Sequence, residues 1–199
     1  MIFSVVSLKG GVGKTTSALY LATCALEDGL RPVVLDADEE GSAISWAQLA
    51  GTRGAVLPFE VIRADRNSPA KQARDLERAG HTVIIDTPPN NRETLTIAGM
   101  VSDFVIVPVS PSGLEVDRLI NTLAVLENVE ASKGSLTFGI LLTRYDARLV
   151  LAREALFGLS AYSVFDTRIR DLTRYQLFGQ VPDYLDEYRA VWREIKEAI

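Results

Sequence analysis

A run of glycines that ends in a lysine and two threonines lies directly after a short apolar segment at the start of the chain. The run consists of Lys9, Gly10, Gly11, Val12, Gly13, Lys14, Thr15 and Thr16. Glycines let the backbone wrap closely around a polyphosphate and point several N–H groups toward it at the start of a helix. Lys14 would reach the β- and γ-phosphates, the Thr15 hydroxyl would bind Mg²⁺, and Thr16 would donate to the α-phosphate. A simple tight turn has no need of these side chains at this spacing, so the run predicts a nucleoside triphosphate site.

Three aspartates stand at or just after the ends of apolar segments. Asp36 and Asp38 follow the apolar run 33–35, and Asp86 ends the run 82–86. Taken singly, each carboxylate would be an ordinary solvated strand end. If the segments are parallel strands, their carboxyl ends share one edge of the sheet with the glycine loop, where ligands of such sheets bind. We therefore expect the aspartates beside the phosphates, where carboxylates can hold Mg²⁺ or orient a water molecule.

The segments that would position these residues alternate between apolar strands and amphipathic helices. Strands are expected at 2–7, 33–36, 59–62, 82–86, 104–109 and 138–142. The first helix is expected after the glycine loop and continues to Gly29, which can form a left-handed cap. Near-continuous apolar strands separated by helices are typical of a parallel sheet with both faces covered. We predict an α/β fold: a single-domain P-loop NTPase with a mostly parallel, twisted β-sheet and helices on both faces.

Length and composition indicate one folded domain of ordinary type. Of the 199 residues, 47% are hydrophobic and 24% are charged, which is far from the composition of a disordered chain. The net charge of −5 gives no general attraction for nucleic acid, so DNA binding would need a local basic patch. The single cysteine, Cys24, excludes an internal disulfide and is expected to be a small buried hydrophobe. Because no signal peptide or membrane-spanning segment is evident, we expect a cytoplasmic protein.

The chain resembles the ParA/MinD family of deviant Walker A P-loop ATPases, and within it the small ParA-type partition proteins. Its loop has Leu8 where an ordinary P-loop has the first glycine, and it carries a second lysine, Lys9. The likeness continues at 34–38 (the family's second motif), 83–89 (the Walker B strand) and 107–112 (the next strand exit). It extends over residues 2–145. Glu39 and Glu40 stand where the family usually has Pro-Gln, which keeps the aspartates in place and leaves the geometry of this switch loop open.

The resemblance implies roles for particular residues. Lys9 would cross a dimer interface to the partner's nucleotide and act like an arginine finger, and Asp38 would orient the attacking water. Lys9, Lys14 and Asp38 are therefore the predicted catalytic residues. The predicted metal-site residues are Thr15, Asp86, which would act through a water, and Asp36 as a neighbour. The adenine is expected near Thr143, Arg144, Pro182 and Asp183, although an arginine at a strand end such as Arg144 could equally be a surface residue.

The resemblance also implies an activity and partners. The chain is expected to be a weak Mg²⁺-dependent ATPase with ATP and Mg²⁺ as cofactors, stimulated by a ParB-like or other small activator protein. It would form a homodimer on binding ATP, bind DNA without sequence preference, associate with the nucleoid, and position a plasmid, chromosome or other cargo. Because no helix-turn-helix precedes the P-loop, residues 1–199 are expected to be a single ParA-like domain.

Two other functions use the same scaffold: a MinD-type membrane-cycling ATPase and a small-molecule P-loop enzyme. MinD-type proteins bind membrane through a C-terminal amphipathic helix. The apolar stripe at the end of this chain consists of Leu185, Tyr188, Trp192, Ile195 and Ile199. Acidic and basic residues are mixed around it, so we expect a helix docked on the domain and no stable membrane binding. The predicted DNA contacts are Arg148, Arg168, Arg170 and Arg174, and the alternative for them is a solvated face of mixed charge.

Overall fold

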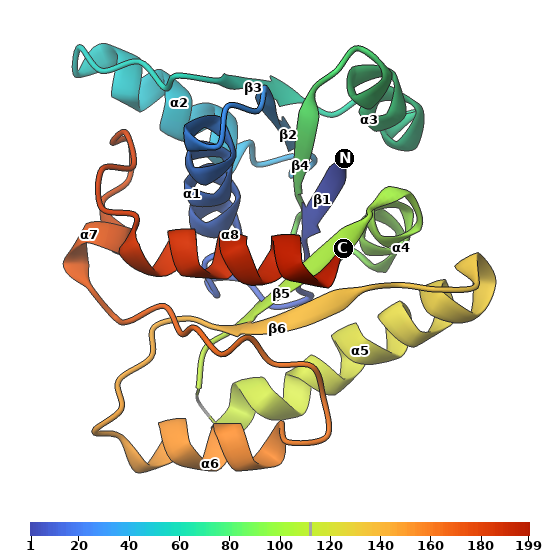
Figure 1. Ribbon diagram of the computed structural model, residues 1–199, viewed down its shortest axis with the longest axis vertical. Coiled ribbons are helices and arrows are strands. Elements are labelled where there is room, and N and C mark those ends of the chain that lie inside the picture. The colour runs from blue at the N-terminus through green and yellow to red at the C-terminus, as the bar shows by residue number, and fades with distance from the viewer. Residues whose placement is uncertain (112) are drawn as a thin grey trace.

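Six parallel strands form one sheet with helices on both faces (Figure 1). The computed structural model describes every residue except 112, and for residues 113–118 it describes the backbone alone. The strands are β1 Ile2–Val5, β2 Pro32–Asp36, β3 Glu60–Arg63, β4 Thr82–Asp86, β5 Phe104–Val109 and β6 Phe138–Leu142, in the spatial order β3-β2-β4-β1-β5-β6. The predicted parallel α/β fold is confirmed. Ser112, at the end of the predicted strand exit 107–112, lies outside the described residues.

The helices divide between the two faces of the sheet. They are α1 Lys14–Glu27, α2 Ser42–Thr52, α3 Pro69–Arg78, α4 Arg92–Val101, α5 Gly113–Lys133, α6 Val150–Gly158, α7 Thr173–Gln176 and α8 Asp186–Ala198. Alternate residues of each strand point to opposite faces, so Phe3 and Val34 pack with α1, α2 and α8. Ile2 and Leu35 pack in a second core with side chains of α3, α4 and α5. Both faces are thus closed by apolar packing, as a parallel sheet requires.

The first strand is shorter than the sequence predicted. It ends at Val5 rather than at residue 7, because the chain turns away from the sheet into the glycine loop, where the Ser7 hydroxyl accepts the N–H of Lys9 at 3.2 Å. The third strand begins and ends one residue later than predicted, at Glu60 and Arg63. This second shift affects the site, because it puts an arginine at the carboxyl end of β3.

The C-terminal helix α8 is docked on the domain, as predicted. Tyr188, Val191, Trp192 and Ile195 are buried against α1 and the sheet, and Trp192 meets Phe3 edge-on with ring centroids 5.2 Å apart. The Trp192 indole donates to Asp28 at 2.8 Å. The apolar face of α8 is therefore part of the core. None of the helices that the structure describes has the length and apolarity that a bilayer crossing requires.

Replacing Trp192 should show how much of the stability comes from the docking of α8. Trp192→Ala is expected to lower the free energy of unfolding by about 3–5 kcal/mol, because it removes a buried ring and leaves a cavity between α8 and β1. Ile199→Ala at the end of the same chain segment is the control; Ile199 is 53% exposed, so its loss should cost less than about 0.5 kcal/mol. Urea denaturation measures both. Equal, small effects would show that α8 is not packed on the sheet.

Candidate functional site

The register of the sheet brings two of the three predicted aspartates to one edge. Asp36, the last residue of β2, pairs in register with Asp86, the last residue of β4. Val5 lies on the other side of Asp86, and the chain leaves β1 there to form the glycine loop. The loop, Asp36 and Asp86 therefore share the carboxyl edge of the sheet, where parallel α/β folds bind their ligands.

Two of the loop glycines are required by the backbone. Gly11 and Gly13 have φ angles of 79° and 89°, in the left-handed region that side-chain-bearing residues rarely adopt. Gly13 also precedes the first residue of α1, so the N–H groups of the first helical turn have no capping side chain beside them. Free N–H groups at a helix start, with the positive end of the helix dipole, attract a phosphate. The loop has the geometry of an anion cradle.

Lys14 lies inside this cradle and is largely withdrawn from water. Its side chain is folded back so that Nζ donates to the backbone oxygen of Lys9 at 3.0 Å, and the residue is only 8% exposed. Burial lowers the pKa of Lys14, and the negative charges of Asp86 and Asp38 partly oppose that effect. A bound polyphosphate would bring negative charge closer to the Lys14 ammonium than these carboxylates do. It would therefore stabilise the charged form of the buried lysine.

Asp86 and Thr15 form the polar pair that fits a magnesium ion. The Thr15 hydroxyl donates to Asp86 Oδ2 at 2.6 Å, and Asp86 is 1% exposed. Burial raises the pKa of Asp86, while the bond from Thr15 opposes the rise. Within the described residues, Asp86 Oδ1 is buried without a hydrogen-bond partner. The Thr15 hydroxyl and the Asp86 carboxylate, whose Oδ1 is still unpaired in the described part of the chain, are the hard oxygen ligands that Mg²⁺ prefers.

The side chains that the structure describes do not form a complete metal cage. Among the described residues, no group of three or more His, Cys, Asp and Glu side chains could hold a metal ion. This agrees with Mg²⁺ chemistry at P-loops, where one or two protein oxygens act with waters and the phosphates of the substrate. The residues present therefore fit a magnesium ion that arrives with a nucleotide.

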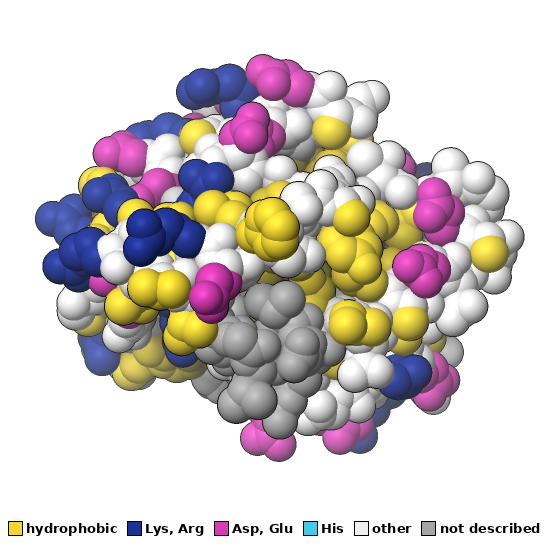
Figure 2. Space-filling view, turned by 90° about the horizontal axis from the view of Figure 1, so that it is seen from below, with side chains coloured by type: hydrophobic (Ala, Val, Ile, Leu, Met, Phe, Trp, Pro, Cys, Tyr) yellow, Lys and Arg dark blue, Asp and Glu magenta, His cyan; other side chains and the backbone are white. Residues whose placement is uncertain are grey.

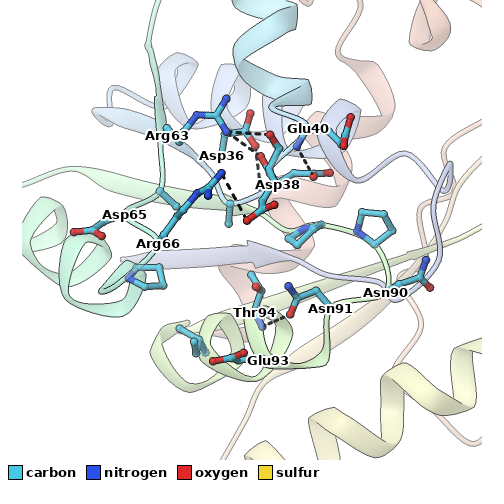
Figure 3. A pocket seen from close by; sticks show the side chains of 17 residues that line it. Asp36, Asp38, Glu40, Arg63, Asp65, Arg66, Asn90, Asn91, Glu93 and Thr94 are labelled. Carbon is cyan, nitrogen blue, oxygen red and sulfur yellow. Dashed lines mark hydrogen bonds and ion pairs between the residues drawn. The ribbon is translucent and has the colours of Figure 1, made fainter.

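Asp36 shapes the loop that carries Asp38. Its two carboxylate oxygens accept the backbone N–H groups of Asp38 at 3.1 Å and of Ile44 at 3.0 Å. With both oxygens engaged, Asp36 connects the end of β2 to the first turn of α2. Asp38 is half-buried, and its Oδ1 accepts the N–H of Glu40 at 3.0 Å. Both aspartates line a cavity of about 520 Å³ at the carboxyl ends of β2, β3 and β4 (Figure 3).

Arg63 is a site residue that the sequence reasoning missed. It pairs in register with Asp36, and its guanidinium Nη1 donates to the backbone oxygens of Asp38 and Glu39, both at 3.3 Å (Figure 3). Arg66 lies 3.7 Å from a Glu39 carboxylate oxygen. The two arginines therefore hold the loop in which glutamates replace the usual Pro-Gln. The available signal was an arginine directly after the weak apolar run at 59–62.

Lys9 lies at the outer end of the glycine loop. It is half-buried and borders a second cavity of about 490 Å³, lined by Leu8, Lys9, Asn90, Arg92 and Asn121. Among the ion pairs of the described residues none involves Lys9. Its backbone oxygen holds Lys14, whereas its own side chain belongs to the cavity wall. The two lysines of the loop are thus placed differently, one inside the cradle and one at its rim.

A third cavity of about 220 Å³ lies beside the phosphate loop and has aromatic walls. Its lining includes Gly13, Thr16, Trp46, Thr143, Arg144, Tyr175, Phe178 and Tyr188. The Thr143 hydroxyl donates to the backbone oxygen of Val12 at 2.9 Å, which joins the end of β6 to the glycine loop. Arg144 has a φ of 51°, an uncommon left-handed conformation for a residue with a side chain. Aromatic and apolar walls next to a phosphate loop suit the flat face of a nucleobase.

The lining of this cavity includes some of the predicted base-site residues and not others. Pro182 and Asp183 are not in the lining of this cavity; residues 169–172, 175, 176 and 178 are. The chain is held there because the Trp46 indole donates to the backbone oxygen of Gln180 at 2.6 Å, which fixes the segment before Pro182 against α2. The contact of Pro182 and Asp183 with the adenine stays a prediction.

The four predicted DNA-contact arginines lie near one another, and two of them form ion pairs. Arg148 pairs with Asp146 through two bonds, Nε to Oδ1 at 2.9 Å and Nη2 to Oδ2 at 2.6 Å. Arg170 pairs with Glu187, and its Nη2 donates to the Tyr184 hydroxyl at 2.8 Å. Such pairs on the surface are weak, so a phosphate could compete for Arg148, which is 89% exposed.

The other two arginines stack on tyrosines. Arg168 lies 5.3 Å from the ring centre of Tyr145, and Arg174 lies 5.0 Å from that of Tyr184. Arg148, Arg168 and Arg170 line one open cavity of about 700 Å³. Figure 2 looks at the molecule from the α6 side and shows Lys and Arg side chains gathered at one end of this face, beside exposed hydrophobic side chains. The structure therefore groups these arginines, with acidic residues among them.

The fold and the loop together define a P-loop nucleotide-binding protein. Residues 3–176 match the family described as the CobQ/CobB/MinD/ParA nucleotide binding domain, and the chain belongs to this family. The predicted ParA/MinD resemblance is thereby confirmed.

Several relatives are partition and positioning proteins by name. The chain is 26% identical over 151 residues to the maintenance of carboxysome distribution protein A of Halothiobacillus neapolitanus, covering 75% of this chain and 69% of that protein. It is 36% identical over 151 residues to the protein of the same name from Gloeobacter kilaueensis, covering 74% and 64%. It is 29% identical over 182 residues to the chromosome-partitioning ATPase Soj of Thermus thermophilus, covering 77% and 73%. The chain thus matches about two thirds to three quarters of the length of each.

Solved structures share the fold at low sequence identity. A putative plasmid partition protein of Borrelia burgdorferi bound to AMPPNP has a TM-score of 0.77 at 18% identity, covering 100% of this chain and 98% of that one. The MinD cell division protein of Aquifex aeolicus has a TM-score of 0.76 at 15% identity, covering 98% and 96%. Cobyrinic acid a,c-diamide synthase of Mycobacterium smegmatis with bound ADP and magnesium has a TM-score of 0.74 at 21% identity, covering 98% and 94%. These likenesses establish the fold.

Proposed function

We propose that this protein is a Mg²⁺-dependent ATPase of the ParA type that dimerises on binding ATP. The dimer binds DNA without sequence preference, and a small activator protein, ParB-like or other, stimulates hydrolysis and releases the dimer. The cycle positions a plasmid, a chromosome or another cargo on the nucleoid. The observation that carries the proposal is the pair of lysines in one phosphate loop, with Lys14 buried in the cradle and Lys9 at its rim.

The proposal gives each residue of the site a role that its position supports. The loop N–H groups and Lys14 would hold the triphosphate, and Thr15, with Asp86 acting through a water, would hold Mg²⁺. When bound, the metal would supply neutralisation of the phosphate charge. Asp38, at the edge of the cavity beside Asp36, orients the attacking water. Lys9 of a second copy reaches the γ-phosphate and stabilises the charge that develops during transfer, so that hydrolysis depends on the dimer.

The docking of α8 favours a ParA-type function over a MinD-type membrane cycle. Membrane binding by the C-terminal helix would need its apolar face, and Tyr188, Val191, Trp192 and Ile195 are buried in the core. Undocking them to reach a bilayer would cost several kcal/mol of apolar burial. Sedimentation with anionic liposomes in the presence of ATP tests this point, and retention there would favour the membrane cycle.

DNA retention tests the DNA-binding part of the proposal. With ATP and Mg²⁺ the protein is expected to bind random-sequence DNA, and affinity should fall steeply with salt because phosphate contacts release counterions. The double variant Arg148→Glu, Arg174→Glu should bind DNA at least about tenfold more weakly. The slope of log affinity against log salt concentration should become less steep by about two. Filter binding at several salt concentrations measures both quantities.

The matched control changes the same number of charges elsewhere. Arg74→Glu with Arg78→Glu alters two arginines of α3, which packs on β4, β1 and α4 and not on β6. This control should bind DNA with nearly the affinity and salt dependence of the unchanged protein. Only the small effect of the change in net charge should remain. If both double variants weaken binding equally, or if retention does not require ATP, the assignment of the DNA surface is wrong.

A further inference from the structure

Three residues after α7 form a strap that contributes Phe178 to the wall of the base cavity and is held by α2. We call Phe178, Gly179 and Gln180 the base strap. Arg53, which caps the C-terminal end of α2, donates through Nη1 to the backbone oxygens of Phe178 at 2.8 Å and Gly179 at 3.3 Å. Together with the bond from Trp46 to Gln180, all three strap carbonyls accept a hydrogen bond from α2. The strap is therefore fixed by one helix along its whole length.

Apolar contacts between α2 and the strap are equally close. The rings of Trp46 and Phe178 have centroids 5.0 Å apart, and Trp46 is buried. Gly179 has a φ of 74°, and a Cβ atom there would lie 2.5 Å from Leu49 Cγ. Only glycine lets the strap approach α2 this closely. Trp46 and Phe178 both line the base cavity, so the contact that holds the strap also forms the cavity wall.

The other end of α2 belongs to the loop that carries Asp38. Gly41 precedes the helix with a φ of 66°, and the N–H of Ile44 in the first turn donates to Asp36. An 11-residue helix is about 16 Å long. One rigid element therefore spans from the aspartate loop to the base cavity.

We propose that Arg53 is a positioning residue for the nucleotide base: by holding the strap it sets the shape of the wall formed by Trp46 and Phe178. This rests on the proposed ATP site, because the cavity is taken to receive the adenine. Arg53 is exposed and is not in the cavity lining, so it acts through the strap and not by touching the nucleotide. Loss of its two bonds leaves the strap held only by Trp46 and by apolar contacts with α2, so the strap is less ordered in the free protein. Nucleotide binding must then restore that order, which lowers affinity.

The test compares a ligand that has a base with one that does not. AMPPNP and inorganic tripolyphosphate, each with Mg²⁺, are titrated calorimetrically into the full chain and its variants. Arg53→Ala is expected to weaken AMPPNP binding by about tenfold and to leave tripolyphosphate binding within about twofold. Arg53→Lys, which keeps one charged donor, should recover part of the loss. Trp46→Phe, which keeps a ring and removes the indole N–H, should also affect AMPPNP alone.

The control is Arg78→Ala on α3, an exposed arginine far from the strap in the fold, which should change neither affinity. If Arg53→Ala leaves AMPPNP binding intact, or weakens both ligands in parallel, the positioning role is wrong while the ATP site stands. If the unchanged protein binds tripolyphosphate but shows no preference for AMPPNP, the cavity is not a base site. If it binds neither ligand, the proposed ATPase function fails as well.

Discussion

Lys14→Ala is expected to lower ATP affinity by at least about a hundredfold. Lys14 is the cation inside the cradle, held 3.0 Å from the Lys9 carbonyl with 8% of its surface exposed. Charge-assisted bonds to phosphate in a site with little water are among the strongest a side chain can make, and no neighbouring cation of the loop can replace this one from the rim. Calorimetric titration with AMPPNP and Mg²⁺ measures the loss.

The same substitution should not destabilise the empty protein. Burial lowers the pKa of Lys14, which means that burying the charged ammonium destabilises the empty protein. Removal of the side chain relieves part of that destabilisation. We therefore expect a melting temperature within a few degrees of the unchanged protein. Lys71→Ala, at an exposed lysine of α3, is the matched control and should bind normally. Normal nucleotide affinity in Lys14→Ala would remove the basis for the phosphate site.

Most of the fold could be predicted from the sequence because its strands are buried on both faces. Such strands are nearly continuous apolar runs, and those at 82–86, 104–109 and 138–142 coincide with β4, β5 and β6. The prediction is weaker where burial is weaker. β3 lies at the edge of the sheet with partly exposed residues, and there the expected span was one residue early. The order of strands in space was not predicted, since it depends on crossover connections and not on local pattern.

Some features of the site also follow from neighbouring residues, whereas others depend on contacts between residues far apart in the sequence. The glycine loop is a local motif, and its backbone geometry follows from residues next to one another, such as Gly11 and Gly13. Arg63 and Arg53 donate to backbone oxygens 25 and 125 residues away. The only local sign of Arg63 is its place after a weak apolar run, and no local pattern indicates the partners of either arginine. The segment beside the base cavity is held by Trp46 on a different helix, a contact that the local pattern does not show either.

The arginines of the C-terminal half show what composition alone leaves out. Between residues 144 and 174 the sequence shows six arginines among acidic residues, but it does not show which of them are paired. In the fold Arg170 is held by Glu187 and Tyr184, so its charge is largely committed within the protein. Arg148 has a similar bond pattern to Asp146 but extends into solvent. The DNA variants proposed above therefore change Arg148 and Arg174 and leave Arg170 in place.

Lys9→Ala is expected to reduce ATP turnover by about a thousandfold while nucleotide affinity of the single chain falls only slightly. A cation donated to the transferring phosphate by a second protein chain is typically worth a factor of 10³ to 10⁵ in rate. Lys9 lies at the rim of the cradle, where the proposed dimer would bring it to a facing copy, and its side chain makes no ion pair with the described residues. Phosphate release at saturating ATP measures the rate.

Dimerisation separates this role from a direct effect within one chain. In a background of Asp38→Ala, where hydrolysis no longer removes the nucleotide, ATP should hold the protein as a dimer in sedimentation or light scattering. Adding Lys9→Ala should return it to monomer, since the lysine contributes binding energy across the interface as well as in the transition state. Arg92→Ala, at a neighbour of Lys9 in the same cavity, is the matched control for a loss of charge at this surface. A Lys9→Ala protein that still dimerises with ATP and hydrolyses it at the normal rate would leave only an ordinary P-loop, in which one chain completes its own site.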